Sequence, residues 1–256
     1  MLKRYHGAEG SATFDVIPAI DLYGGRVVRL SQGDFERETA YSAEPASVAA
    51  AFLAAGARTL HVVDLDGARS GRPAQREAEA AILDTARNRA ACQVAGGLRT
   101  GDDVAAALDL GAARVVVGTA ALADPAFAAR LVAEHGVDRI VVALDVRDGV
   151  AVGEGWREGA AGVGVDDAIA RLSAAGIGTF AVTAIDRDGL LGGPDVALLE
   201  RLVALRIGDV IASGGIAGID DIGRVRDIGC VGVIVGRAIY EGRVDLAAAV
   251  AEYATG

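Results

Sequence analysis

Short apolar runs alternate along this chain with longer Ala- and Leu-rich stretches, in which apolar residues recur at helical spacing. This alternation is typical of βα units that assemble a parallel sheet. The predicted strands are Val16–Leu22, Thr59–Asp64, Cys92–Ala95, Arg114–Val117, Arg139–Asp145, Thr179–Thr183, Asp209–Ser213 and Val231–Val235. The predicted helices cover residues 46–56, 75–90, 101–111, 125–135, 165–176, 195–206, 219–228 and 244–254. Eight such units in 256 residues predict a (β/α)8 TIM barrel, with a doubly wound open sheet as the alternative.

An internal repeat favours the barrel. The segment Ala95–Leu98 (Ala-Gly-Gly-Leu) recurs 118 residues later as Ser213–Ile216 (Ser-Gly-Gly-Ile). In the first strand of each half, Ala19–Asp21 matches Ala143–Asp145. Strands 1–4 therefore look like a copy of strands 5–8, which predicts a two-fold internal repeat of half-barrels. No linker or change of composition separates the halves, so we expect residues 14–256 to form a single domain after a polar leader at residues 1–13.

Composition excludes several classes of function. Hydrophobic residues make up 52% of the chain and charged residues 23%, which allows a large core and excludes intrinsic disorder. The formal charge of −10 argues against a nucleic-acid binder, because such a protein needs a basic surface. No apolar run approaches the ~20 residues of a membrane span, and the first residues lack the apolar stretch of a secretory signal. We therefore expect a cytoplasmic protein with no nucleic-acid or membrane partner.

The scarce residue types narrow the chemistry further. Lys3 is the only lysine, so a Schiff-base lysine inside the core is excluded. The three histidines have no mutual spacing suited to a zinc site. Cys92 and Cys230 are two isolated thiols, which fits a reducing compartment and no disulfide framework. The oligomeric state stays open, and a monomer is compatible with the sequence.

Glycines follow four of the predicted strands, two in each half. A glycine at the carboxyl end of a barrel strand lets the backbone approach an anion, and the next helix start supplies unpaired N–H groups. Barrels commonly bind phosphate after strands 7 and 8. The candidate phosphate-binding residues are Gly96, Gly97, Gly118, Thr119, Gly214, Gly215, Gly236 and Arg237. Two phosphate sites on opposite sides of one barrel mouth predict an elongated small-molecule ligand with a phosphate at each end.

Carboxylates end two strands that lie across the barrel from each other. Asp21 ends strand 1 and Asp145 ends strand 5, and strand alternation places each on the same face as a small alanine two residues earlier. Two carboxylates that flank the middle of a substrate suit general acid–base catalysis. Asp64 and Thr183 end strands 2 and 6 and are interpreted as a further equivalent pair. Thr183 could hydrogen-bond a substrate hydroxyl, whereas Asp64 could contact substrate or anchor a loop.

Other residues are assigned by their position. His61 shares a strand with Asp64 but falls on the opposite face, so we expect it to point to the helix layer as a packed or surface residue. Two long loops are predicted on the catalytic face, at Ser31–Pro45 and Gly153–Gly164. The second carries Trp156 among glycines, which indicates either a lid over a planar ring or an aromatic packed on the rim.

The motifs together resemble the ProFAR isomerase family of histidine biosynthesis, the phosphoribosylformimino-aminoimidazole carboxamide ribotide isomerases. The likeness runs from about residue 14 to 254. The motifs that carry it are Pro18–Leu22, Gly25–Asp34, His61–Ala68, Asp186–Gly189 and Val235–Ala238. The resemblance implies a (β/α)8 barrel that rearranges a doubly phosphorylated aminoaldose to the aminoketose without metal or cofactor.

The resemblance also implies roles for single residues. Asp21 would be the general base, Asp145 the general acid, and Thr183 would assist. The expected substrate contacts besides these are Asp64, Arg99 and Trp156. From residue spacing alone, which aspartate starts protonated stays open.

Three rival functions fit the sequence less well. The cyclase subunit of imidazole glycerol phosphate synthase typically has a Cys-Leu-Asp opening and a nearby lysine, whereas this chain has Ala19-Ile20-Asp21 and no lysine there. A dual-substrate relative that also isomerises phosphoribosylanthranilate usually has an arginine shortly before the Gly-Trp pair, and Val152-Gly153-Glu154 offers none. A catalytically silent barrel that only binds phosphometabolites is disfavoured by the intact Asp21, Asp145 and Thr183. The single-substrate isomerase is therefore the prediction.

Overall fold

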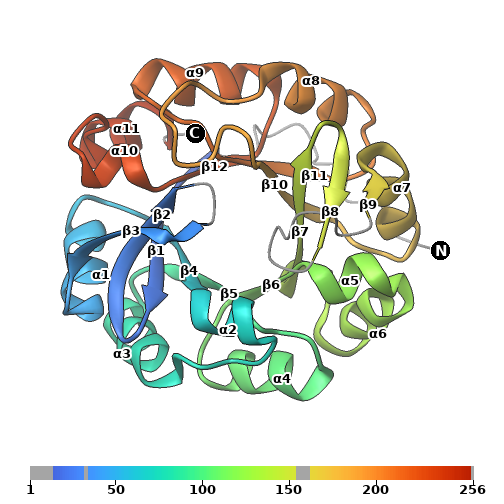
Figure 1. The fold of residues 1–256 in the computed structure, drawn as a ribbon, viewed down its shortest axis with the longest axis horizontal. Helices are drawn as coiled ribbons and strands as arrows, with labels where there is room; N and C mark the ends of the chain where they lie inside the picture. The colour runs from blue at the N-terminus through green and yellow to red at the C-terminus, as the bar shows by residue number, and fades with distance from the viewer. Residues whose placement is uncertain (1–13, 32–33, 154–161, 255–256) are drawn as a thin grey trace.

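The computed structural model describes residues 14–31, 34–153 and 162–254. Within these residues, eight parallel strands close into a barrel surrounded by helices, and Figure 1 looks into this ring. The ring closes because β10 pairs with β7. In order around it, the strands are β1 (Asp15–Tyr23), β4 (Thr59–Asp64), β5 (Ala91–Ala95), β6 (Arg114–Val117), β7 (Ile140–Arg147), β10 (Thr179–Ala184), β11 (Asp209–Ser213) and β12 (Gly232–Val235). The predicted (β/α)8 barrel is confirmed and the open sheet is excluded.

Helices follow the strands and form the outer layer (Figure 1). The main helices are α1 (Pro45–Ala54), α3 (Arg76–Ala86), α4 (Gly101–Asp109), α6 (Pro125–His135), α7 (Val165–Ala174), α8 (Val196–Ala204), α9 (Ile219–Ile228) and α11 (Leu246–Tyr253). Four of these eight begin at a side chain that accepts from a free amide of the first turn, namely Thr100 for α4, Asp124 for α6, Asp195 for α8 and Asp245 for α11. All eight predicted helices are confirmed, with ends that differ by up to four residues. No helix in the described ranges is long and apolar enough to cross a membrane.

Short elements that the sequence did not predict lie between strands and main helices. Three are single helical turns or little more: α2 (Leu65–Ser70), α5 (Thr119–Ala123) and α10 (Arg237–Tyr240). A 3-10 turn, η1 (Val137–Arg139), precedes β7. The others are antiparallel strands: β2 (Arg26–Ser31), β3 (Asp34–Ser42), β8 (Val150–Val152) and β9 (Gly162–Gly164).

The antiparallel strands correct the two predicted loops. The segment Ser31–Pro45 is not one long loop, because β3 occupies Asp34–Ser42 and pairs with β2. The segment Gly153–Gly164 ends in β9, which pairs with β8. Trp156 lies outside the described residues, as does the predicted leader at residues 1–13.

Two apolar layers hold the barrel. The larger lies between the strands and the helices and contains, for example, Leu60, Val62 and Phe180. The smaller fills the interior of the ring, with side chains from six strands: Ile17, Ala19, Val116, Val141, Ala181, Ile211 and Ile234. Because side chains alternate along a strand, these residues identify the inward face of each strand. That face carries the candidate site at the carboxyl ends of the strands.

Candidate active site

Asp21 stands on the inward face of β1, two residues beyond Ala19, and is 8% exposed. Arg29 on β2 donates from Nη1 to Oδ2 of Asp21 at 2.6 Å. Burial raises the pKa of Asp21 to about 6, against a lowering by Arg29 and a further small rise from Asp188. A carboxyl with this pKa is largely ionised at pH 7 yet still a useful proton acceptor.

Arg29 and Asp188 belong to the site, although the sequence analysis did not assign them to it. Nη2 of Arg29 lies 4.0 Å from Oδ1 of Asp188, in the loop after β10, so Arg29 stands between two carboxylates. Burial raises the pKa of Asp188, while Arg29 and the amide of Gly189 lower it. Both residues lie in motifs that carried the family resemblance. Only the unpredicted strand β2 shows that Arg29 reaches Asp21.

Asp145 and Thr183 lie side by side on the opposite wall. Asp145 is on β7, four strands from β1 around the ring in either direction. The strand register pairs Asp145 with Thr183 of β10. Both follow inward-facing alanines, Ala143 and Ala181, and both are half-buried. The structure therefore places Asp21 on one wall of the barrel mouth and Asp145 with Thr183 on the other.

The glycines of the second half line a small pocket that is open to solvent. Its lining includes Ser213, Gly214, Gly215, Gly236 and Arg237, together with Arg29 and Asp188, and the guanidinium of Arg29 lies against Gly236. Added Cβ atoms at Gly214 and Gly215 would meet the backbone carbonyls of Ala184 and Gly193. Only glycine allows these strand ends to pack so closely.

The side chain of Arg237 is already engaged. Its Nη1 donates to the carbonyl of Gly189 at 2.5 Å, and its Nε donates to Glu241 at 2.5 Å. Arg237 therefore closes the pocket by holding the loop that carries Asp188.

The first half repeats this backbone. Gly96 packs on the carbonyl of Asp64 as Gly214 packs on that of Ala184. Gly118 has φ −112° and ψ −95°, and Gly236 has φ −111° and ψ −98°. The predicted two-fold repeat is therefore visible in the strand ends themselves. Gly97 and Thr119 complete this set, and the guanidinium of Arg99 lies beside Gly71 at its rim and reaches the carbonyl of Ala68 at 3.5 Å.

The predicted equivalence of Asp64 and Thr183 is wrong by one residue. The register pairs Asp21 with Val63 and Asp145 with Thr183, so Val63 is the counterpart of Thr183. Asp64 faces the other way and is fully buried. Its carboxylate accepts from the amides of Gly67, Ala74 and Gln75 at 2.7, 2.5 and 3.0 Å. These contacts favour the loop-anchoring alternative over a substrate contact.

The predicted orientation of His61 is wrong for the same reason. It pairs in register with Ala19 and therefore points into the barrel, not toward the helices. Its Nδ1 lies 2.8 Å from Nε2 of Gln93, whose Oε1 accepts from Arg114. Burial, Arg29 and Arg114 lower the pKa of His61 to about 3, so it is neutral. Among the described residues no group of three His, Cys, Asp or Glu side chains could hold a metal ion.

Comparison with known proteins places this geometry in a family. Residues 15–245 match the family model described as histidine biosynthesis protein. Three similar proteins come from Chloroflexus aggregans (44% identity, covering 94% of this chain and 100% of the relative), Rubrobacter xylanophilus (50%, covering 91% and 94%) and Erythrobacter litoralis (47%, covering 92% and 97%). Each is named 1-(5-phosphoribosyl)-5-((5-phosphoribosylamino)methylideneamino)imidazole-4-carboxamide isomerase.

Proposed function

The chain belongs to the histidine biosynthesis protein family and is an isomerase, and we propose that it rearranges the aminoaldose ProFAR to its aminoketose by general acid–base catalysis. ProFAR is the compound in the relatives' name, and it carries two phosphoribosyl groups. The observation that carries the proposal is the placement of Asp21 and Asp145. They stand at the carboxyl ends of opposite strands, each on the inward face.

The substrate spans the barrel mouth. One phosphate binds at Gly214, Gly215 and Gly236, where the structure has a pocket beside Arg29. The other binds at the repeated strand ends, Gly96 and Gly118, with Arg99 at the rim. Backbone amides at such glycines bind phosphate without a basic surface, which agrees with the net charge of −10. The reacting ribose then lies between the two walls.

Ring opening needs an acid. Asp145 donates a proton to the ribose ring oxygen, the bond from that oxygen to C1 breaks, and the nitrogen lone pair forms a protonated imine with C1. The hydroxyl of Thr183, adjacent to Asp145 in register, can orient that carboxyl or the opened sugar. The ring oxygen stays on C4 of the sugar as a hydroxyl group.

Isomerisation then needs a base. Asp21 takes the proton from C2, the electron pair forms the C1–C2 double bond, and the imine electrons return to nitrogen. The enolamine becomes the ketose when C1 is protonated and the C2 hydroxyl loses its proton. Burial raises the pKa of Asp21 to about 6, so its carboxylate is a stronger base than an exposed aspartate. The hydrogen bond from Arg29 keeps that carboxylate oriented.

Turnover of purified protein with ProFAR tests this function. We expect conversion to the aminoketose by wild type and loss of about 10²–10⁴-fold in kcat for Asp21→Asn and Asp145→Asn. A barrel that only binds phosphometabolites would show no conversion by the wild type. The same assay with phosphoribosylanthranilate separates a single-substrate from a dual-substrate isomerase.

A further inference from the structure

The hairpin that carries Arg29 is tied to the rest of the barrel at its tip. β1 and β2 are joined by the two-residue turn Gly24–Gly25, with φ values of +54° and +76°. Two positive φ values are typical of a type I′ hairpin turn, for which glycine is suited. The turn's amides take no part in the hairpin ladder and can bind groups outside it.

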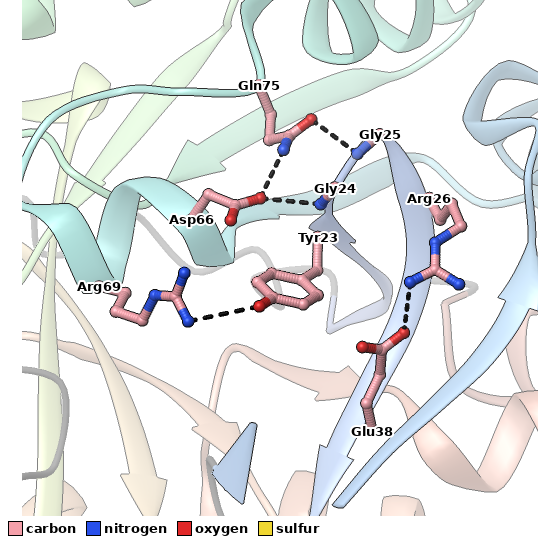
Figure 2. Close-up of polar contacts among 8 residues, drawn as sticks. All are labelled: Tyr23, Gly24, Gly25, Arg26, Glu38, Asp66, Arg69 and Gln75. Carbon is pink, nitrogen blue, oxygen red and sulfur yellow. Dashed lines mark hydrogen bonds and ion pairs between the residues drawn. The ribbon is translucent and has the colours of Figure 1, made fainter. Parts of the chain in front are cut away.

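Both partners come from the segment after β4. The amide of Gly24 donates to Oδ2 of Asp66 at 2.8 Å, and the amide of Gly25 donates to Oε1 of Gln75 at 3.1 Å. Nε2 of Gln75 donates to the same Oδ2 of Asp66 at 2.5 Å, which closes a ring of three hydrogen bonds (Figure 2). We name Asp66 and Gln75 the tip clamp. The clamp thus holds both free amides of the turn.

A second contact steadies the same face of the hairpin. Arg69 of α2 donates to the hydroxyl of Tyr23 at 3.3 Å (Figure 2). Its guanidinium also lies 5.0 Å from the ring centre of Phe35, which packs on Tyr23. The whole of α2 therefore docks against the tip of the hairpin.

The clamp is rooted in the first phosphate site. Asp64 accepts from the amide of Gln75 and so fixes the backbone from which the Gln75 side chain extends. The carbonyl of Asp64 is the group on which Gly96 packs. A continuous path of contacts therefore leads from the first glycine pair, through Asp64 and the clamp, to the strand that carries Arg29.

The second half has a counterpart of this tie. β7 and β8 are joined by Asp148–Gly149, with φ values of +51° and +76°. Arg147, just before that turn, lies 3.5 Å from Asp186, two residues beyond β10. Asp66 likewise lies two residues beyond β4. An aspartate at this position therefore contacts the preceding hairpin in both halves, through a turn amide in the first half and through the side chain of Arg147 in the second.

We propose that Asp66 and Gln75 are positioning residues, which hold the β1–β2 hairpin so that Arg29 stays against the Asp21 carboxylate. The proposal rests on the proposed function, in which Asp21 is the base. Without the clamp, the hairpin tip is free to twist away and Arg29 moves back from Asp21. Asp21 then faces Asp188 of the loop after β10 and Tyr240 of α10, with less of the cation that offsets its burial. His61 on β4 stays neutral and does not replace that cation.

The direction in which the pKa of Asp21 shifts separates a positioning role from the direct electrostatic effect of the Asp66 charge. Removal of the Asp66 charge acts on Asp21 through space in only one way, by lowering its pKa. Retreat of Arg29 raises the pKa of Asp21 instead. Gln75 is neutral, so Gln75→Ala has no direct charge effect and reports the retreat alone.

We therefore measure kcat/KM against pH for Asp66→Ala and Gln75→Ala. The expected result is an acidic limb that moves up by about half a pH unit, with kcat/KM at pH 7 reduced about tenfold. Asp66→Asn keeps an acceptor for the Gly24 amide and restores most of the loss. Glu38→Gln is the matched control, because the Arg26–Glu38 pair at 2.9 Å joins β2 to β3 without contact to the tip clamp and should leave the limb in place (Figure 2).

Outcomes that overturn the proposal are equally specific. A lower melting temperature with an unmoved acidic limb makes the clamp merely structural, and a downward shift in Asp66→Ala leaves only the field effect. A carbon-13 NMR titration of the Asp21 carboxyl, assigned with Asp21→Asn, gives the same pKa without turnover. If wild type fails to convert ProFAR, the proposed function fails, while this titration still decides whether the clamp holds Arg29 on Asp21.

Discussion

Asp21 combines burial with an ion pair, and the balance between them sets when it can act as a base. Burial raises its pKa to about 6, and Arg29 limits that rise. Because the base must be ionised, kcat/KM should increase with pH through an inflection near 6, which is the acidic limb of the profile. The measurement is a pH series of kcat/KM with ProFAR. An inflection near 4 would show that Arg29 outweighs burial.

The same pKa makes a prediction about stability. In the unfolded chain Asp21 ionises near 3.8, and in the folded protein near 6. Folding therefore favours the protonated form of Asp21. The free energy of unfolding decreases as pH rises from about 4 to above 6, because the carboxyl must then be ionised in the folded protein. Asn at this position mimics the protonated carboxyl.

Asp21→Asn should therefore be inactive yet more stable than wild type at pH 8, by up to about 3 kcal/mol, with no difference below pH 4. Urea unfolding at pH 4 and pH 8 measures both differences. Equal stability at pH 8 would mean that Arg29 fully compensates the buried charge.

At the scale of elements, the sequence pattern predicted the strands that consist of apolar runs. Every barrel strand is such a run, and each was found. β3 (Asp34–Ser42) was missed because its sequence, DFERETAYS, carries polar residues on both faces and has no apolar run. With β3 and β2 missing from the prediction, nothing brought Arg29 to Asp21.

The error at β4 has a different origin. The strand itself was predicted with the right ends, but Asp64 was matched to Thr183 by its place at the strand end. Register matches Val63 instead, and a slip of one residue turns every side chain to the opposite face. The inward His61 and the outward Asp64 were exchanged for that reason. The sequence pattern shows that side chains alternate between the two faces of a strand, whereas strand pairing decides which of them face the barrel interior.

Asp64 should therefore matter for stability. Three backbone amides lose their acceptor in Asp64→Ala, which we expect to destabilise the protein by about 2–4 kcal/mol, whereas Asp64→Asn should lose less because one acceptor oxygen remains. Urea unfolding measures both. Asp84→Ala removes an exposed carboxylate paired with Arg87 and serves as the control near zero. If Asp64→Ala keeps its stability but loses substrate affinity, Asp64 is a substrate contact after all.

For the whole molecule, the duplication gives two glycine sets, and we propose that they bind the two phosphates of one elongated ligand. Asp21 and Asp145, the two glycine sets and the two hairpin turns all repeat with the halves. The halves differ where the chemistry is asymmetric: Arg29 follows Val28, the partner of Asp21, whereas Gly153 follows Val152, the partner of Asp145. We propose that this repeated scaffold holds the two ends of the substrate, with Arg29 beside the carboxylate of the first half.

Two linked sites should bind a doubly phosphorylated ligand far better than either phosphate alone. We expect one molecule of the aminoketose product per chain, bound about 10²–10⁴-fold more tightly than ribose 5-phosphate, because the second contact is intramolecular. Gly215→Ala, whose Cβ would collide with the carbonyl of Gly193, should reduce most of that advantage. Gly242→Ala, at φ +69° with open space around it, carries the strain without the collision and should retain the affinity. Calorimetric titration that gave two molecules of the product per chain, or equal affinity for both ligands, would contradict this. The two glycine sets would then not bind the two phosphates of one ligand.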